Sequence, residues 1–119
     1  MPKTLTILFR TGSMMAMDSN VAVKLAKAAI EKGYRVHMFG YGEGVTAVKK
    51  GQKPKRFPNV GEELAEIQSK GATTAVCETC FAARGFERGE EIEGAKVGSL
   101  TNDLFRFVSE SDRLVTIAR

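Results

Sequence analysis

Two cysteines three positions apart are the residues in this sequence whose types and spacing best suit chemistry. Cys77 and Cys80 are the only cysteines among 119 residues and lie in the segment Cys-Glu-Thr-Cys. A thiolate in such a pair can exchange disulfides or carry sulfur as a persulfide, and the pair can also supply two zinc ligands. A zinc site would have to be shared between subunits, because His37 is the only histidine. We therefore expect thiol chemistry, with no metal site and no cofactor.

The position of Cys77 favours it as the nucleophile of the pair. Cys77 is expected where a strand meets the helix that carries Cys80, and the unpaired N–H groups of a helix start favour a thiolate. Glu78 would oppose this if it lay close, whereas Arg84 could neutralise nearby charge. A thioredoxin-like dithiol oxidoreductase stays an alternative, although the motif has no proline and the chain has no tryptophan. A scaffold protein with incidental cysteines is a third hypothesis.

Strands and helices are expected to alternate along the chain. This order predicts right-handed β-α-β crossovers and a single three-layer α/β/α domain over residues 1–119, with a mostly parallel sheet of about five strands. The first helix is expected to begin at Asp18 or Ser19 and to end at Gly33. Its predicted core-facing stripe consists of Val21, Leu25, Ala28 and Ala29. Strands are expected at 4–10, 34–41, 73–76, 96–98 and 112–118, the last one buried, and further helices at 45–50, 61–70, 78–84 and 99–109.

The loops that follow the strands should form the functional site. In parallel sheets the binding crevice lies outside the carboxyl ends of the strands. Residues 11–18, 40–44 and 77–80 would meet at this edge. The candidate pocket residues beside the cysteines are Gly12, Ser13, Met14, Met15, Tyr41, Gly42 and Arg84.

Charge and hydropathy narrow the classes of partner. The sequence shows neither a signal peptide nor an apolar run of spanning length, so we expect a cytoplasmic protein that does not enter a membrane. The formal net charge is +4, and five of the cations lie between Lys49 and Arg56. No nucleic-acid motif accompanies them, so nucleic acid is not an expected partner. This segment is either a solvated loop or a docking site for an acidic protein.

Over nearly its whole length the chain resembles the DsrE/TusD family of sulfur-relay (sulfurtransferase) proteins. The segments that carry the resemblance are DSNVAVKLAKAAIEKGYRVHMFGYGEGV, AVCETCFAARGF and DRLVTIA. The resemblance implies an α/β sheet and one reactive cysteine, matching Cys77, that accepts sulfane sulfur as a persulfide or thiosulfonate and passes it to a partner's cysteine. It also implies persulfide-donor and sulfur-acceptor proteins as partners. The chain would form a homo-oligomer (dimer, trimer or hexamer) or a hetero-oligomer with related subunits, in which a non-catalytic scaffold role is an alternative. Cys80 is outside the basic pattern of the family, which leaves open whether a Cys77–Cys80 disulfide forms.

Overall fold

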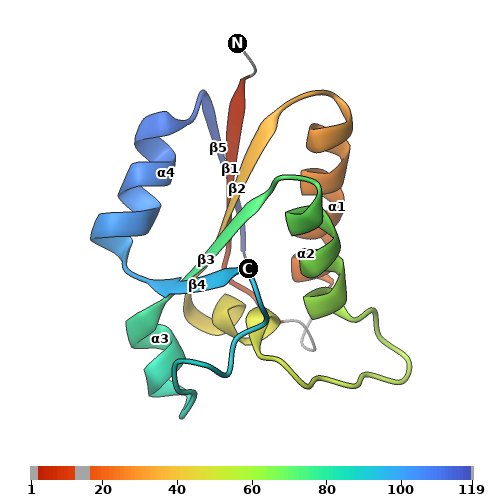
Figure 1. Ribbon diagram of the computed structural model, residues 1–119, viewed down its shortest axis with the longest axis vertical. Coiled ribbons are helices and arrows are strands. Elements are labelled where there is room, and N and C mark those ends of the chain that lie inside the picture. Colours follow the sequence, from red (N-terminus) through yellow and green to blue (C-terminus); the bar gives the residue numbers. More distant parts are fainter. Residues whose placement is uncertain (1–2, 13–16, 119) are drawn as a thin grey trace.

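Five parallel strands form one sheet at the centre of the molecule (Figure 1). The structure is a computed structural model that describes residues 3–12 and 17–118. The sheet order is β4-β3-β2-β1-β5. The predicted parallel α/β sheet is confirmed, whereas the strand order was not predictable from sequence. The strands are β1 (Thr4–Phe9), β2 (Arg35–Gly40), β3 (Thr73–Cys77), β4 (Ala95–Gly98) and β5 (Arg113–Ile117).

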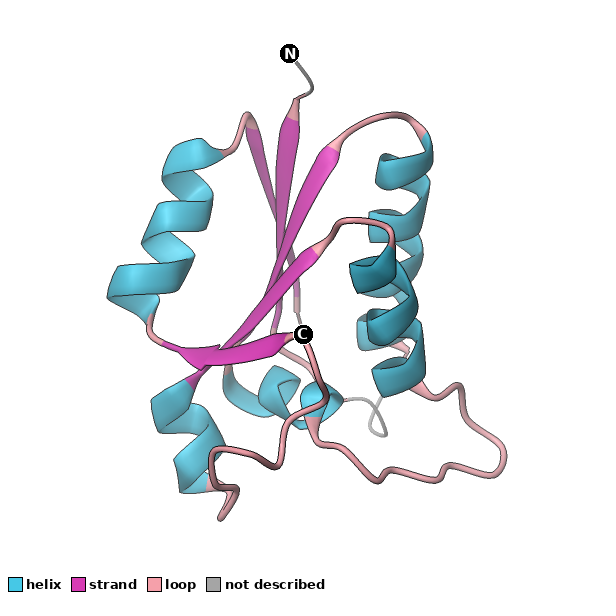
Figure 2. Ribbon diagram, viewed as in Figure 1, coloured by secondary structure: helices cyan, strands magenta, loops and turns pink. Residues whose placement is uncertain are grey.

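Helices cover both faces of this sheet (Figure 2). On one side lie α1 (Asp18–Glu31) and α2 (Val60–Ser69), and on the other lies α4 (Phe105–Glu110). The predicted helix at 45–50 is instead a 3₁₀ helix, η1 (Gly42–Val48), which begins at a glycine with φ of 60°. The described residues also form the cysteine-bearing helix α3 (Glu78–Ala83) and the π-helical turn η2 (Leu100–Leu104). No helix in the described part of the chain is long and apolar enough to cross a membrane.

The two faces of the sheet differ in polarity because side chains alternate along each strand. Ile7 and Met38 lie in register on the apolar face that α1 and α2 cover. Thr6 and His37 lie on the opposite face, where both contact Phe107 of α4. The Thr6 hydroxyl donates a hydrogen bond to the Phe107 carbonyl. The His37 ring stacks on the Phe107 ring, with 4.3 Å between the ring centroids. A single buried phenylalanine thus anchors α4 to a partly polar surface.

The last strand was predicted to be buried, and this was wrong. β5 pairs only with β1 and forms an edge of the sheet. Leu114 is 47% exposed, and none of the strand's residues falls in the buried class. Apolar composition predicts the strand but not its place in the sheet, because an edge strand and a central strand can look alike in sequence.

The predicted core-facing stripe of α1 is also largely wrong. Val21 and Leu25 are exposed, and the buried apolar positions are Ala22, Val23, Ala26 and Ala29. Small alanine side chains let this helix pack closely on the sheet, so Val23 is buried among them while Val21 and Leu25 point outward. Nor do Asp18 or Ser19 cap the helix, which has Met17 at its N-cap position and no side-chain cap.

Candidate functional site

Cys77 is the last residue of β3 and lies at the carboxyl edge of the sheet. Its neighbour in register on β4 is Gly98. The segment after β2 forms η1, which packs against α3 at the same edge. The predicted meeting of the loops after the second and third strands is therefore present in the structure.

The two cysteines are in direct contact through the first turn of α3. The backbone N–H of Cys80 donates to Sγ of Cys77 at 3.5 Å, so Cys77 occupies the N-cap position with its own side chain as the acceptor. Cys77 is only 5% exposed, whereas Cys80 is half-buried, and both are free thiols. This geometry brings both sulfurs to one site without joining them.

The environment of Cys80 favours its protonated form. Burial raises the pKa of the Cys80 thiol, and its hydrogen bond with the Cys77 side chain raises it further. A hydrogen bond with the backbone of Gly42 and the positive charge of Arg84 act in the opposite direction, but the pKa stays above its ordinary value. The site therefore holds a thiol that keeps its proton beside the buried sulfur of Cys77.

A cavity of about 280 Å³ opens onto the two cysteines. Tyr41, which was predicted to line the site, forms part of its wall. The other walls come from the start of α3 and from the turn after β4. The lining residues are Tyr41, Cys77, Glu78, Thr79, Cys80, Ser99 and Leu100. The cavity gives a route to a sulfur that is otherwise buried.

Arg84 does not line this cavity but connects two elements beside it. Its guanidinium donates to the Cys80 carbonyl at 2.8 Å and, through Nε, to the Glu43 carboxylate at 2.9 Å. The hydrogen bond and charge of Glu43 raise the pKa of Arg84, which stays cationic at any physiological pH. Arg84 thus connects α3 to η1, so its place in the site is structural support close to Cys80.

The remaining predicted pocket residues lie elsewhere or outside the described residues. Gly42 is at the start of η1 and reaches the site only through its backbone contact with Cys80. Gly12 is buried against η1, where a β-carbon would come within 3.1 Å of the Thr46 hydroxyl, and it is not among the lining residues of the cavity. Ser13, Met14 and Met15 fall outside the described residues, so the predicted methionine wall stays a prediction.

The turn after β4 was not among the predicted site residues. Ser99 and Leu100 line the cavity, and the buried carboxylate of Asp103 accepts a hydrogen bond from the Ser99 N–H at 2.8 Å. Asp103 also pairs with Lys96 at 2.8 Å. Burial alone would raise the pKa of Asp103, but the bonds from Lys96 and Ser99 outweigh it and hold the pKa below its usual value. The Gly-Ser pair before a helix was the available sequence signal, since Ser99 caps η2.

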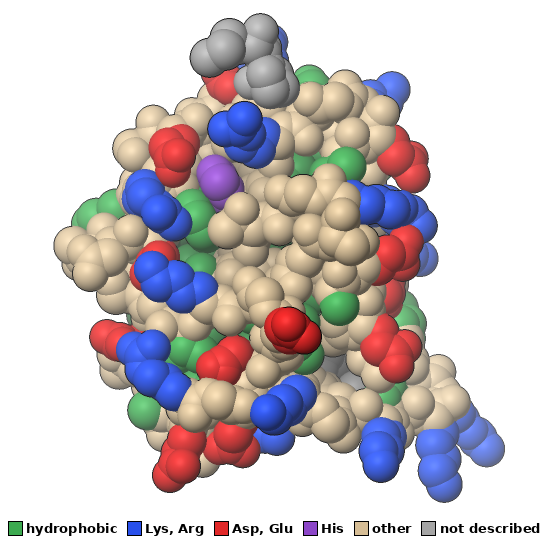
Figure 3. All heavy atoms as spheres, viewed as in Figure 1, with side chains coloured by type: hydrophobic (Ala, Val, Ile, Leu, Met, Phe, Trp, Pro, Cys, Tyr) green, Lys and Arg blue, Asp and Glu red, His purple; other side chains and the backbone are tan. Residues whose placement is uncertain are grey.

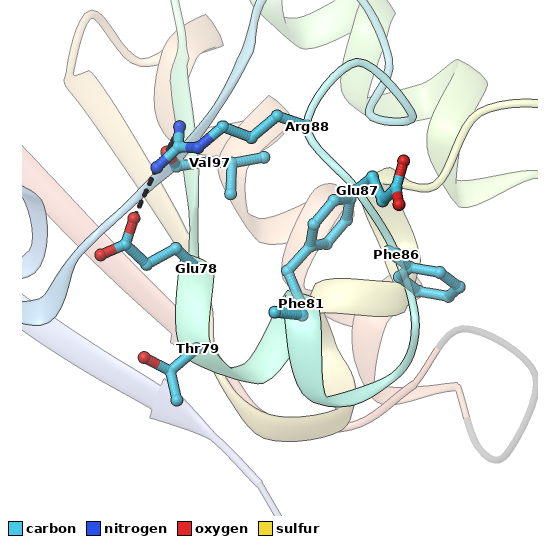
Figure 4. A pocket seen from close by; sticks show the side chains of 8 residues that line it. Glu78, Thr79, Phe81, Phe86, Glu87, Arg88 and Val97 are labelled. Carbon is cyan, nitrogen blue, oxygen red and sulfur yellow. Dashed lines mark hydrogen bonds and ion pairs between the residues drawn. The ribbon is translucent and has the colours of Figure 1, made fainter.

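A second hollow, of about 630 Å³, lies beside the cysteine cavity and shares Glu78 and Thr79 with it. Figure 4 shows that Arg88 reaches across this hollow to an ion pair with Glu78, above the apolar side chains of Phe81 and Val97. The second guanidinium nitrogen of Arg88 donates to the Val97 carbonyl at 2.8 Å. Glu78, which also lines the cysteine cavity, therefore has its charge paired with that of Arg88.

The described residues contain no group of three or more His, Cys, Asp or Glu side chains that could hold a metal ion. His37 lies on the sheet face under α4, stacked on Phe107, and is not part of the cysteine cavity.

Fold and site together define a parallel α/β protein with a cysteine pair at the carboxyl edge of its sheet. The chain belongs to the DsrE/DsrF-like family, whose model matches residues 3–117. It is 40% identical to protein MJ0989 of Methanocaldococcus jannaschii over 95 residues, which is 80% of this chain and 82% of that protein. It is 35% identical to protein MK0008 of Methanopyrus kandleri over 94 residues, 79% of this chain and 77% of that one.

Solved structures share the fold. The crystal structure of the ychN protein from Escherichia coli matches with a TM-score of 0.88 at 24% identity, over 98% of this chain and 99% of that chain. Protein MTH1491 from Methanobacterium thermoautotrophicum matches with a TM-score of 0.76 at 13% identity, over 98% and 99% of the two chains. The DsrE-like fold is therefore shown, and family membership suggests a role related to sulfur relay.

Proposed function

We propose that this protein carries sulfane sulfur as a persulfide on Cys77 and passes it to a cysteine of a partner protein. The observation that supports this most directly is the pair of free thiols at an open cavity on the carboxyl edge of the sheet. A carrier needs a sulfur that is shielded between transfers yet reachable by one attacking group at a time. A buried Cys77 that lines an open cavity fits both requirements.

The loading step is a displacement at sulfur. The Cys77 thiolate attacks the outer sulfur of a donor persulfide, a new S–S bond forms, and the donor leaves as a thiolate with the electron pair of the broken bond. The outer sulfur keeps its proton, so Cys77 becomes a persulfide. Transfer repeats the same step with an acceptor thiolate as the attacking group, which regenerates the Cys77 thiolate. No net oxidation or reduction occurs in this cycle.

The contact between the cysteines supports a second outcome. If Cys80 loses its proton and attacks the inner sulfur of the Cys77 persulfide, a Cys77–Cys80 disulfide forms and hydrosulfide leaves. The thiols are oxidised and the outer sulfur is reduced, so a dithiol reductant must then restore the pair. The raised pKa of Cys80 slows this attack and favours the carried persulfide. The same closeness is why a dithiol oxidoreductase stays the competing function.

The partners follow from this chemistry. A donor persulfide protein and an acceptor cysteine protein are required, in a compartment such as the cytoplasm that keeps thiols reduced. We also propose that the chain assembles with copies of itself or with related subunits, because large apolar side chains are exposed on α4 and β5. They are Phe105, Val108 and Leu114.

Intact-mass measurement tests the proposal. The reduced protein, Cys77→Ser and Cys80→Ser are each incubated with a low-molecular-weight persulfide, and their masses are compared. Gain of one sulfur that is lost with Cys77→Ser but kept with Cys80→Ser is the expected result. Loss of two hydrogens that requires both cysteines, with no sulfur gain, would instead establish dithiol redox chemistry. No change in any protein would leave a scaffold role.

A further inference from the structure

A basic segment, residues 49–57, forms most of the connection between η1 and α2 and extends from the body of the molecule (Figure 1). Blue side chains gather over this region in the space-filling view, at the lower right of Figure 3. Its exposed cationic side chains are those of Lys50, Lys53, Lys55 and Arg56. Four positive charges on so short a stretch make a strong local field for a molecule with a net charge of only +4.

These four charges are not neutralised by the fold. Lys49 forms an ion pair with Glu90 at 3.5 Å, but among the described residues none of the four exposed cations lies within ion-pair distance of a carboxylate. The surface salt bridges of the described chain are formed by other lysines and arginines. The basic segment therefore offers its charge outward.

Hydrogen bonds anchor the chain at both ends of the basic segment. The amide of Gln52 donates to the carbonyls of Thr46 and Lys49, at 2.7 and 2.9 Å. The amide of Asn59 donates to the Gln52 carbonyl at 3.2 Å, and the Lys50 N–H donates to the Glu90 carbonyl at 2.8 Å. The cations between these two ends are thus presented on a short loop with fixed ends, which limits the entropy lost on binding.

The segment also offers apolar contact area. Phe57 is 56% exposed beside the cations. A groove of about 370 Å³ runs between the segment and α2, with Lys50 and Lys53 on one side and Ala65 and Ile92 among the apolar residues that line it. The single carboxylate in this lining is Glu62. A ligand that combines negative charge with an apolar side chain would fit this combination.

The segment lies on the same edge of the sheet as the cysteines. η1 joins the two regions, because it packs against α3 and ends where the basic segment begins. The ammonium of Lys49 lies 5.9 Å from the ring of Phe86, and that ring packs edge-on against Phe81 of α3. A macromolecule bound at the basic segment would therefore be held on the face where Cys77 is reached.

We propose that the basic segment is the docking surface for an acidic segment of the protein that exchanges sulfur with Cys77. That the docked protein exchanges sulfur with Cys77 rests on the proposed function. The partner is a protein because the groups that give or take a persulfide here are cysteine thiols. Charge attraction at the basic segment, outside the cysteine cavity, would speed the encounter of the two proteins and orient the partner without obstructing the cavity. One exposed aromatic ring is too few for the stacked bases of single-stranded RNA.

The test uses a cysteine-free probe, so that binding is measured apart from sulfur chemistry. The probe is a fluorescently labelled peptide of aspartate and glutamate with one leucine, and its neutral match replaces the acids by asparagine and glutamine. Fluorescence anisotropy measures binding to the wild-type protein and to a variant with Lys50, Lys53, Lys55 and Arg56 changed to Gln. A control variant changes Lys3, Lys24, Lys32 and Arg35 to Gln, which removes the same charge from α1 and the opposite edge of the sheet.

The acidic peptide should bind the wild type and the control variant alike, and the basic-segment variant about tenfold more weakly or worse. Binding should weaken as the salt concentration rises, and the neutral peptide should not bind. Equal loss in both variants would show attraction to net charge alone and would overturn the proposal. Tighter binding of a labelled polyuridine RNA that requires the four cations would overturn it in favour of nucleic acid.

Persulfide loading from a low-molecular-weight donor separates this proposal from the proposed function. The basic-segment variant should load Cys77 as the wild type does, because the donor needs no docking. Peptide binding without any loading would contradict the sulfur-carrier function while leaving the acidic docking surface in place. Circular dichroism and thermal unfolding confirm that both variants are folded.

Discussion

The carboxylate of Asp103 occupies the space in which a side chain on Gly98 would begin. A β-carbon built on Gly98 would lie 2.0 Å from Oδ2 of Asp103, the same oxygen that accepts the Ser99 N–H. Gly98 is also the register neighbour of Cys77. The wall of the cysteine cavity after β4 thus depends on a glycine that admits a buried carboxylate.

Gly98→Ala should lower the free energy of unfolding by about 1–3 kcal/mol, because Asp103 must move and leave the Ser99 N–H without its partner. Urea titration measures the change. The same substitution in an Asp103→Ala background should cost less, since the clash is then absent, and this double-mutant cycle isolates the effect. Equal costs in the two backgrounds would show that the two residues do not interact as described.

The low pKa of Asp103 predicts a dependence of stability on acid. A carboxyl whose pKa is lower in the folded state than in the unfolded chain stabilises the fold above its unfolded pKa, and this contribution is lost as the pH falls through the folded value. Asp103→Asn should therefore be less stable than the wild type near neutral pH, and the difference should shrink below pH 3.8, the ordinary value of the group. Urea titrations at several pH values test this. A difference that stays constant down to the acid transition would contradict the assignment.

His37 predicts a second dependence, in a higher pH range. Burial lowers the pKa of His37 below 6.5, the nearby Glu110 acts to raise it, and Arg106 and Arg35 add to the lowering. Among the described residues its Nδ1 has no hydrogen-bond partner. Because the unfolded chain binds the proton more readily, the stability contribution is complete above pH 6.5 and is lost as the pH falls toward the folded pKa. The free energy of unfolding should fall with a slope of at most about 1.4 kcal/mol per pH unit.

The matched variant for this experiment is His37→Phe, which keeps a ring to stack on Phe107 but cannot take a proton. Its unfolding free energy should be flatter between pH 7 and the folded pKa than that of the wild type. Identical slopes in the two proteins would assign the pH dependence to other groups.

The sequence predicted the parts of the fold that local pattern controls. The five strands, the parallel α/β class and the position of Cys77 at a strand end followed from apolar runs, glycines and the order of elements. Two features depend on tertiary packing and did not follow. β5 is an edge strand, and α1 packs on the sheet through alanines instead of Val21 and Leu25.

The candidate site was predictable to a similar extent. Tyr41 and the two cysteines meet at one cavity because parallel strands bring their carboxyl ends to one edge. Ser99, Leu100 and the supporting Asp103 were missed because they are distant in sequence from the cysteines, and the Gly-Ser pair indicates a helix start and not a place beside Cys77. Arg84 was expected to act on charge near Cys77, and the charges of Glu43, Cys80 and Cys77 do contribute to its raised pKa. Its guanidinium also joins Glu43 to the Cys80 carbonyl, a link that the sequence did not predict.

The exposed apolar side chains of α4 and β5 predict the surface through which copies of the chain associate. Phe105 is 62% exposed, Val108 lies one helical turn further on, and Leu114 lies beside Thr6 on the face that α4 covers. Phe105→Gln with Leu114→Gln should shift the sedimenting species toward the mass of a single chain, because both changes remove apolar area whose burial would stabilise the assembly.

The matched control is Val21→Gln with Leu25→Gln, which alters exposed apolar residues of α1 on the opposite face and should leave the assembly intact. Dissociation by the control alone would move the interface to α1, and a wild type that sediments as a single chain would remove the proposal of self-association altogether.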